Sequence, residues 1–115
     1  MVVDDVADEE VDGLFRALAD ATRRDIVHRC IREESSVSRL ADVYPMSFAA
    51  VQKHVAVLER AGLITKKRIG RRKVVRTNLH GVRVAQRLLE RYEEMWADRF
   101  DRMTDLITQT QETDQ

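Results

Sequence analysis

The 115-residue sequence contains one cysteine, Cys30, one proline, Pro45, and four glycines. A single thiol cannot form an internal disulfide or a cysteine-based zinc site within one chain, so we expect a cytoplasmic protein. Proline and glycine interrupt regular structure most often, and their scarcity predicts a mostly helical fold with short connections. At this length we expect one domain with a modest core.

Long apolar runs are also missing. No stretch approaches the roughly 18 apolar residues of a membrane span, and the acidic start, MVVDDVADEE, lacks the basic region of a secretion signal. The sequence has no Gly-rich phosphate loop, no His-x-x-x-His, no Cys-x-x-Cys and no recognisable set of nucleophile and base. We therefore expect neither a membrane protein nor an enzyme, and no cofactor.

Charged residues are abundant but unevenly distributed. The chain has 20 basic and 20 acidic residues, and its formal net charge is zero. Acidic residues dominate 1–12 and 92–115, whereas 16–91 are strongly basic. The densest cluster, KKRIGRRK at 66–73, has six cations in eight positions. A basic middle between acidic ends is typical of a surface that binds a polyanion, although arginine-rich solvated helix faces give the same pattern.

Apolar residues at helical spacing predict four helices in the first half of the chain, with N-caps at Asp20 or Thr22, at Ser36 and at Ser47. Pro45 must end the third helix, because proline lacks an N–H and restrains the residue before it. The predicted apolar faces are Val11, Leu14, Phe15 and Leu18; Ile26, Val27, Cys30 and Ile31; Val37, Leu40, Ala41 and Val43; and Val51, Val55 and Leu58, followed by Gly62 as the C-terminal glycine.

After Gly62 the periodicity changes. The segment LITKKRIGRRKVVRTNL, 63–79, is rich in β-branched residues and predicts a β-hairpin with its tip at Gly70. Unpaired cations are costly to bury, so this tip must project into solvent. From Gly81 a long final helix carries an apolar stripe at near-heptad spacing, which is too long for one small domain to cover.

A short helix, a tight turn and a second helix, followed directly by a basic hairpin, predict a winged helix-turn-helix. In this arrangement the second helix enters the major groove of DNA while the hairpin, or wing, contacts the flanking backbone. Gln52, Lys53 and His54 supply donors and acceptors, and the small Ala49 permits close approach. Phe48 is expected either to contact a thymine methyl group or to join the core.

The segments LFRALADATRRDIV and MSFAAVQKHVAVLERAGLITKKRIGRRKVVRTNL resemble the ArsR/SmtB family of bacterial winged-helix repressors. The resemblance covers about 11–110 and rests on ALADATRRDIV, S-x-x-AV-x-KH-x-x-VLE-x-AGL and the GRR turn. It implies a mainly α fold with a β-hairpin wing, in the order α-α-α-α-β-β-α, that dimerises through its terminal helices. It also implies repression at a partly palindromic operator until a signal releases the protein.

The resemblance assigns DNA contact to the recognition helix, 47–61, and to the wing, 63–79. The resemblance and the helix-turn-helix pattern together give the expected DNA-binding residues, which are Ser47, Phe48, Ala49, Gln52, Lys53, His54, Arg68, Arg71, Arg72 and Lys73. The expected dimer-interface residues are Leu14, Leu88, Tyr92, Met95, Trp96, Arg99, Met103 and Leu106. The expected partners are double-stranded DNA and a second copy of the chain.

The family includes metal sensors. These bind the metal through a cysteine pair on the first helix of the helix-turn-helix, or through His and carboxylate ligands on the last helices. The matching helix here, SVSRLADVY, has neither Cys nor His, and the final helix has neither. Asp98, Asp101 and Asp105 share a face, but oxygen ligands alone suit such metals poorly. We expect no metal site and an unknown effector, and we expect Cys30 to be a buried apolar residue.

We expect an acidic, frayed N-terminus at 1–10, a winged helix-turn-helix domain with its dimerisation helix at 11–110, and a disordered tail at 111–115. Two alternatives remain open. One is an interaction module whose long helix docks a protein while the hairpin meets a polyanion without sequence preference. The other is an ArsR-type sensor with a metal or redox site that the sequence does not reveal.

Overall fold

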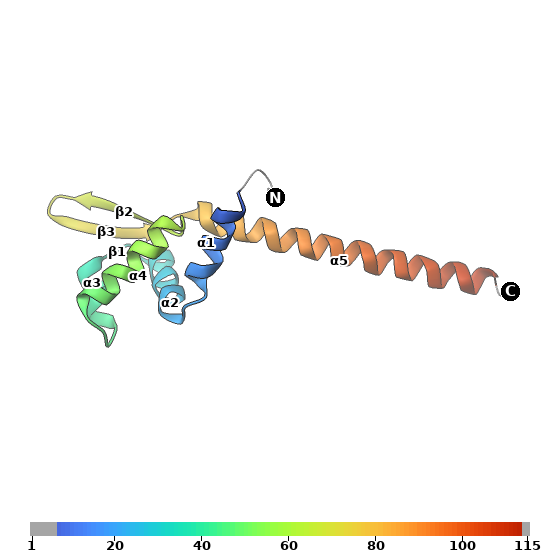
Figure 1. Ribbon diagram of the computed structural model, residues 1–115, viewed down its shortest axis with the longest axis horizontal. Coiled ribbons are helices and arrows are strands. Elements are labelled where there is room, and N and C mark those ends of the chain that lie inside the picture. The colour runs from blue at the N-terminus through green and yellow to red at the C-terminus, as the bar shows by residue number, and fades with distance from the viewer. Residues whose placement is uncertain (1–6, 114–115) are drawn as a thin grey trace. The chain divides into compact units, whose positions relative to one another are not determined.

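The structure is a computed structural model that describes residues 7–113, with side chains described to residue 110. Its elements follow in the order α1 (Asp8–Leu18), α2 (Ala21–Arg32), β1 (Ser35–Ser36), α3 (Val37–Val43), α4 (Phe48–Arg60), β2 (Ile64–Ile69), β3 (Arg72–Thr77) and α5 (Leu79–Thr113) (Figure 1). This confirms the predicted order and adds one short strand, β1. The chain divides into two compact units, residues 1–85 and 86–115.

Side-chain caps determine where α2, α3 and α4 begin. The side-chain oxygens of Asp20, Ser36 and Ser47 each accept the backbone N–H three residues further on, at 3.0–3.1 Å. Each cap satisfies an amide that the first turn of a helix leaves unpaired. Asp20, and not Thr22, is therefore the cap of α2, and the predicted caps at Ser36 and Ser47 are confirmed.

Two arginines join α1 to α2. Arg23 donates from Nε to the carbonyl of Ala17 at 2.8 Å and from Nη2 to the carbonyl of Arg16 at 3.1 Å. Arg24 donates from Nη1 to the carbonyl of Leu18 at 2.7 Å. The last carbonyls of a helix have no partner within it, and a guanidinium group satisfies them while its charge complements the negative end of the helix dipole.

The core lies in the first unit, and it buries one face of each of the first four helices against the sheet. Its largest fully buried side chains are Leu14, Ile26, Leu40, Val51, Val55, Leu58, Leu63, Ile64 and Val75. Ile31 and Val43 were expected on buried faces but are 61% and 45% exposed. Both stand at the ends of their helices, where the apolar stripe extends beyond the core.

Leu14 requires a correction. It was expected at a dimer interface, but its side chain is 0% exposed within its own chain. It packs in the same hydrophobic cluster as Ile26 and Val55. A side chain that its own fold buries completely has no surface left for a partner, so Leu14 is a core residue.

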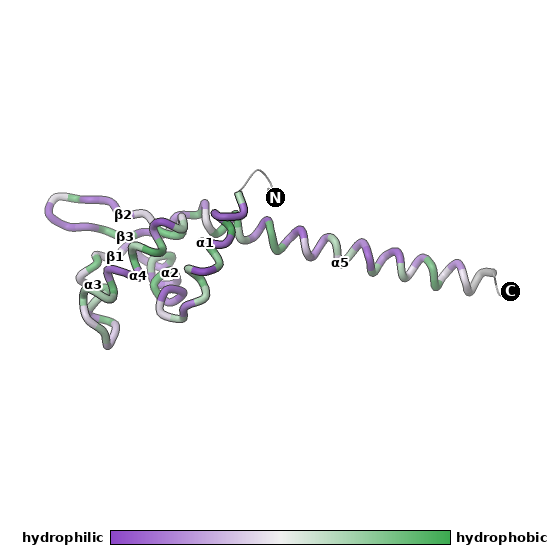
Figure 2. The backbone as a smooth tube through the Cα atoms, viewed as in Figure 1, coloured by the Kyte–Doolittle hydropathy of each residue, from purple (hydrophilic) through white to green (hydrophobic). Residues whose placement is uncertain are grey.

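The three strands form one antiparallel sheet in the order β1-β3-β2. Ser35 pairs with Val75, and Ile69 pairs with Arg72 across the two-residue turn of the predicted hairpin. The end of the hairpin nearest the helices is buried through Ile64 and Val75, whereas its far end is exposed. Figure 2 shows the far end mostly in the colour of hydrophilic residues. β1 was not predicted, because two serines carry no apolar alternation.

α5 begins at Leu79, two residues before the predicted start, and runs for 35 residues. Asn78 precedes it, and its Oδ1 accepts the N–H of His80 at 3.0 Å. The first turns of α5 belong to the first unit, where Val84 is buried. Residues 1–6 of the predicted frayed N-terminus and residues 114–115 of the predicted tail lie outside the described residues, whereas Asp8–Glu10 are helical and α5 includes 111–113.

Within the described residues, no helix is both long and apolar enough to cross a membrane. The second unit consists of the remainder of α5, and large apolar side chains on it are 52–66% exposed. These side chains are Leu89, Tyr92, Met95, Trp96, Phe100, Met103, Leu106 and Ile107. Their spacing of three and four residues places them along one broad side of the helix.

Candidate nucleic-acid interface

α3, the turn at 44–47 and α4 form the predicted helix-turn-helix. Val51 and Val55 face the core and are fully buried. Phe48, which is 47% exposed, and Gln52, which is also exposed, lie at the edge of this buried face, toward the wing. Phe48 is not part of the buried core, and its contact with a base stays a prediction. Ser47, Ala49 and Lys53 are exposed on the same helix end.

His54 is placed differently from the other predicted residues of this helix. It is half-buried, and its Nδ1 lies 3.3 Å from Nη1 of Arg23 on α2. His54 stands three residues after Val51 and four before Leu58, so it shares the side of α4 that faces the protein. An acceptor at Nδ1 requires a ring with its proton on Nε2. The structure therefore turns His54 toward α2 and away from the exposed surface.

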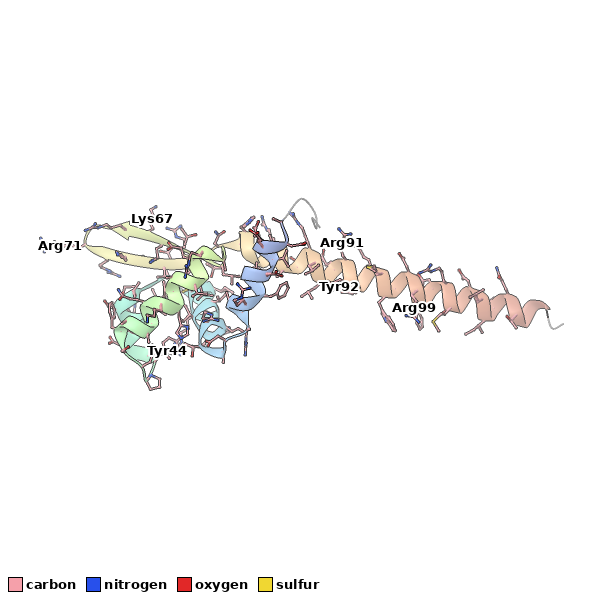
Figure 3. The ribbon with its side chains drawn as sticks, viewed as in Figure 1. Tyr44, Lys67, Arg71, Arg91, Tyr92 and Arg99 are labelled. Atoms are coloured by element: carbon pink, nitrogen blue, oxygen red, sulfur yellow. The ribbon has the colours of Figure 1, made fainter. Side chains whose placement is uncertain are left out.

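The wing consists of β2, β3 and the turn between them. Gly70 has a φ of +62°, a left-handed conformation that glycine adopts without strain, so the predicted tip is confirmed. Lys66 is half-buried, and its Nζ lies 3.6 Å from Oε1 of Glu59. Within residues 7–113 it is the one cation of the cluster with an acidic partner. Lys67, Arg68, Arg71, Arg72 and Lys73 are exposed. Figure 3 shows Arg71 at the tip of the hairpin and Lys67 farther back along it.

A hollow of about 400 Å³ lies between α4 and the wing. Phe48 and Gln52 line it from the recognition helix, and Arg71, Arg72 and Lys73 line it from the wing. The remaining lining residues are Ser36, Val37, Ser38, Val55 and Lys66. Five predicted DNA-binding residues, distant in the sequence, therefore share one concave, cationic surface.

Comparison with known proteins agrees with this geometry. A helix-turn-helix domain family model matches residues 18–67. The HTH-type transcriptional regulator Rv2034 of Mycobacterium tuberculosis is 36% identical over 81 residues, which are 70% of this chain and 76% of that protein. The crystal structure of the ArsR family transcriptional regulator RHA00566 matches with a TM-score of 0.76 and 30% identity, over 84% of this chain and 97% of the other. The chain belongs to the ArsR family of transcriptional regulators.

A second similar structure shows the same fold at lower identity. It is the homodimeric winged helix-turn-helix DNA-binding domain of Mb0332 from Mycobacterium bovis, a possible ArsR-family regulator. It matches with a TM-score of 0.61 and 22% identity, over 75% of this chain and 81% of the other. This likeness confirms the winged helix-turn-helix fold.

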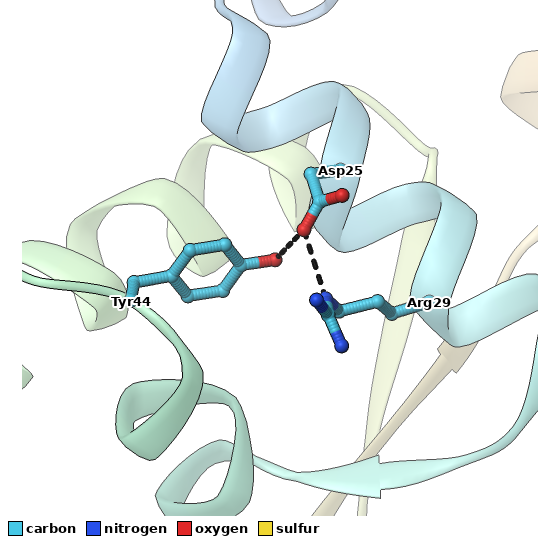
Figure 4. A network of polar contacts seen from close by, with 3 residues as sticks. All are labelled: Asp25, Arg29 and Tyr44. Carbon is cyan, nitrogen blue, oxygen red and sulfur yellow. Dashed lines mark hydrogen bonds and ion pairs between the residues drawn. The ribbon is translucent and has the colours of Figure 1, made fainter.

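The turn of this ArsR-family helix-turn-helix is held by a network that the sequence did not reveal (Figure 4). The hydroxyl of Tyr44 donates to Oδ2 of Asp25 at 2.5 Å, and Nε of Arg29 donates to the same oxygen at 2.8 Å. The guanidinium group of Arg29 also lies 5.8 Å from the centre of the Tyr44 ring. Asp25 and Arg29 stand four residues apart, a spacing in the sequence that indicates an ion pair on one helix. Their third partner, Tyr44, lies at the C-terminal end of α3, and no local pattern pointed to it.

The electrostatics of this network follow from its hydrogen bonds. The Tyr44 hydroxyl and then Arg29 hold the pKa of Asp25 below its ordinary value. Burial and the hydrogen bond to Asp25 raise the pKa of Tyr44, so it remains a neutral donor. A charge-assisted hydrogen bond of this kind links the turn at 44–47 to α2.

The described part of this ArsR-family chain contains no group of three or more His, Cys, Asp or Glu residues gathered to hold a metal ion. Asp98, Asp101 and Asp105 are exposed on α5, beside Arg102. Cys30 is 4% exposed, and burial raises the pKa of its thiol to about 11. Its place in the hydrophobic core confirms the predicted role as a buried apolar residue.

The predicted dimer-interface residues other than Leu14 all lie in the second unit. Leu88 is half-buried, whereas Tyr92, Met95, Trp96, Arg99, Met103 and Leu106 are exposed. Tyr92 and Arg99 are seven residues apart and share one side of α5, which can be followed in Figure 3. The cation of Arg99 therefore lies within the apolar stripe.

Proposed function

We propose that this ArsR-family regulator represses transcription by binding, as a homodimer, to a partly palindromic operator in double-stranded DNA. The hollow between α4 and the wing carries this proposal, because it joins Gln52 to three wing cations on one surface. A regulator needs both kinds of contact, since base edges provide specificity and phosphates provide position and affinity. No catalytic step is proposed, and the site of action is the cytoplasm.

The N-terminal end of α4 reads bases in the major groove. Gln52 is exposed there and can donate to and accept from an adenine edge with its side-chain amide. Ala49 is small and exposed, so the helix can approach the base pairs closely. Phe48 contributes an apolar edge that suits a thymine methyl group, and Lys53 binds guanine or a phosphate. Ser47 remains at the capped end, where backbone amides face a phosphate.

The wing binds the backbone beside the base-reading helix. Arg68, Arg71, Arg72 and Lys73 are exposed, and within the described residues none of them has an acidic partner to compete with phosphate. Neutralising phosphates releases counterions, so affinity falls as salt rises. The wing supplies affinity without reading sequence.

The second copy of the chain covers the apolar stripe of α5. Its eight large apolar side chains are each more than half exposed, and such stripes mark interaction surfaces. A second copy is the natural occupant because two recognition helices match the two halves of a palindrome. Mb0332, which has the same fold, is homodimeric in this domain. Arg99 within the stripe would pair with an acidic residue of the second copy.

Selection of binding sites from a random duplex pool at about 150 mM salt tests the proposal. We expect enrichment of an inverted repeat whose half-sites lie about one helical turn apart. Preference for this site over random DNA should reach roughly 10³-fold. Retention of duplex without any enriched sequence would contradict the proposal. It would favour the alternative, an interaction module that binds polyanions without sequence preference.

A further inference from the structure

A second cavity, of about 520 Å³, lies between α2, β1 and α3. It shares no lining residue with the hollow beside α4. Its volume is within the range of small-molecule sites, which is about 300–1,000 Å³. The lining residues are Asp25, His28, Arg29, Arg32, Glu33, Glu34, Ser35, Arg39, Leu40 and Val43.

The charges of this cavity do not cancel locally. Three arginines and three acids line it, but two of the acids are already engaged. Asp25 accepts from Arg29 and Tyr44, and Glu34 lies 3.8 Å from Nε of Arg76, which is outside the cavity.

Arg32 and Arg39 are the cations that remain. Both are exposed, and within residues 7–113 neither guanidinium group has a hydrogen-bond or ion-pair partner. Glu33 is the one lining acid without such a partner, so the unengaged groups carry a net positive charge. Arginine presents a planar set of donors that matches the two oxygens of a carboxylate or phosphate.

The cavity also has an apolar side. Leu40 is 1% exposed and closes the cavity against the core, and Val43 is 45% exposed at the end of α3. An Arg-lined cavity with an apolar wall suits a molecule with an acidic group at one end and a carbon skeleton at the other. Its walls come from both α2 and α3, so an occupant bridges two helices.

We propose that this cavity binds a small organic anion. Its carboxylate or phosphate group is held by Arg32 and Arg39, and its carbon skeleton lies against Val43, the exposed apolar side chain of the cavity. Asp25 and Arg29 line the same cavity and hold the turn at 44–47 through Tyr44. The occupant therefore sits beside the network that attaches the helix-turn-helix to α2. Binding of this ligand does not depend on the proposed DNA contacts.

Titration of the full-length, isotope-labelled chain with citrate, and separately with inorganic phosphate, at constant ionic strength tests this site by amide chemical shifts. We expect saturable shifts in residues 33–40 for at least one probe, with a dissociation constant below about 10 mM. A response to citrate alone indicates a carboxylate ligand, and a response to phosphate indicates a phosphorylated one. The double variant Arg32→Ala/Arg39→Ala should weaken binding at least about tenfold. Arg60→Ala removes a cation that lines neither hollow and should change nothing.

Three results would overturn the proposal: no saturable shift with either probe, equal binding by the double variant, or equal loss in Arg60→Ala. DNA binding by the double variant supplies a further check. The slope of log DNA affinity against log salt is compared between this variant and Arg71→Ala/Arg72→Ala. If both variants flatten the slope equally, Arg32 and Arg39 contact the DNA backbone, and the proposed small-anion site is wrong. The thermal midpoint of the double variant should match the wild type, because both arginines are exposed.

Discussion

Gly81 at the start of α5 lies directly against the carbonyl group of Gly62 after α4. The N–H of Gly81 donates to this oxygen at 2.9 Å, and a Cβ added at residue 81 would lie 2.6 Å from it. Gly62 has a φ of +80°, which glycine adopts without strain. Both partners are backbone, so no side-chain rotation can relieve a clash. This contact places the first turn of α5 against the end of the recognition helix.

Gly81→Ala should therefore destabilise the protein. We expect the free energy of unfolding to fall by about 1–3 kcal/mol, the cost of forcing an extra methyl group into a packed site. Urea unfolding at a fixed protomer concentration measures it. Gly13→Ala is the matched control, because Gly13 is in α1 with nothing within 4 Å of an added Cβ. It should stabilise the chain by about 0.5–1 kcal/mol. Equal effects of the two substitutions would contradict the close contact.

Tyr44→Phe removes the hydroxyl that bonds to Asp25 and keeps the ring that packs beside Arg29. We expect a loss of about 1 kcal/mol in the free energy of unfolding, because the hydrogen bond is charge-assisted but the carboxylate is partly solvated. Urea unfolding at neutral pH measures the loss. An unchanged midpoint would show that the network does not stabilise the turn.

The effect of Tyr44→Phe should depend on pH. The pKa of Asp25 is lowered in the folded chain, chiefly by the Tyr44 hydroxyl. Its stabilising effect is complete above the pKa of an unfolded aspartate, about 3.9, and is lost as pH falls through the lower folded value. The difference between wild type and variant should thus be full at pH 7 and shrink below about pH 4. The same difference at pH 7 and pH 3 would rule out an ionised Asp25 as the acceptor.

The wing prediction concerns affinity for all DNA. Arg71→Ala/Arg72→Ala should weaken binding to the selected site and to random duplex alike. If each arginine neutralises one phosphate, the slope of log affinity against log salt should flatten by about 1.8. Fluorescence anisotropy at several salt concentrations measures this slope. Arg60→Ala, in the last turn of α4, should leave the slope unchanged. A slope unaffected by the double variant would remove the wing from the interface.

Gln52→Ala tests base reading. We expect a loss of about 1–3 kcal/mol in binding to the selected site and little change on random duplex, because the side-chain amide discriminates bases and does not neutralise phosphate. Lys53→Ala is the neighbouring comparison, and if Lys53 binds phosphate it should weaken both. Equal losses on both DNAs for Gln52→Ala would mean that residue 52 does not read bases.

Trp96 tests the apolar stripe of α5 as the dimer surface. Trp96→Glu places a charge in the middle of the stripe, and a buried unpaired charge would cost several kcal/mol at an interface. Light scattering after gel filtration at about 10 μM should show a dimer for the wild type and a monomer for the variant. Asp98→Ala changes a residue about 200° further around the helix and should leave the dimer intact. A wild-type monomer would exclude this surface as a dimer interface.

Local chemistry determined much of this fold. Ser36 and Ser47 begin helices because their side chains satisfy amides only three residues away. Gly70 forms the wing tip because the tight turn there requires a positive φ, which glycine adopts without strain. The cationic composition of the wing likewise forces its tip into solvent. Such features depend on a few consecutive residues, so they could be predicted from the chain, as could the family motifs that lie within them.

Other features depended on residues far apart in the chain. Tyr44 meets Asp25 across 19 positions, and His54 turns toward Arg23 across 31. Leu14 carries the apolar signature of either a core or an interface residue, and β1 is too short to have any periodicity. Which apolar face is buried, and which polar groups meet, depends on how the helices pack. Packing is a sum of many weak contacts between distant residues, and no local pattern in the chain encodes their geometry.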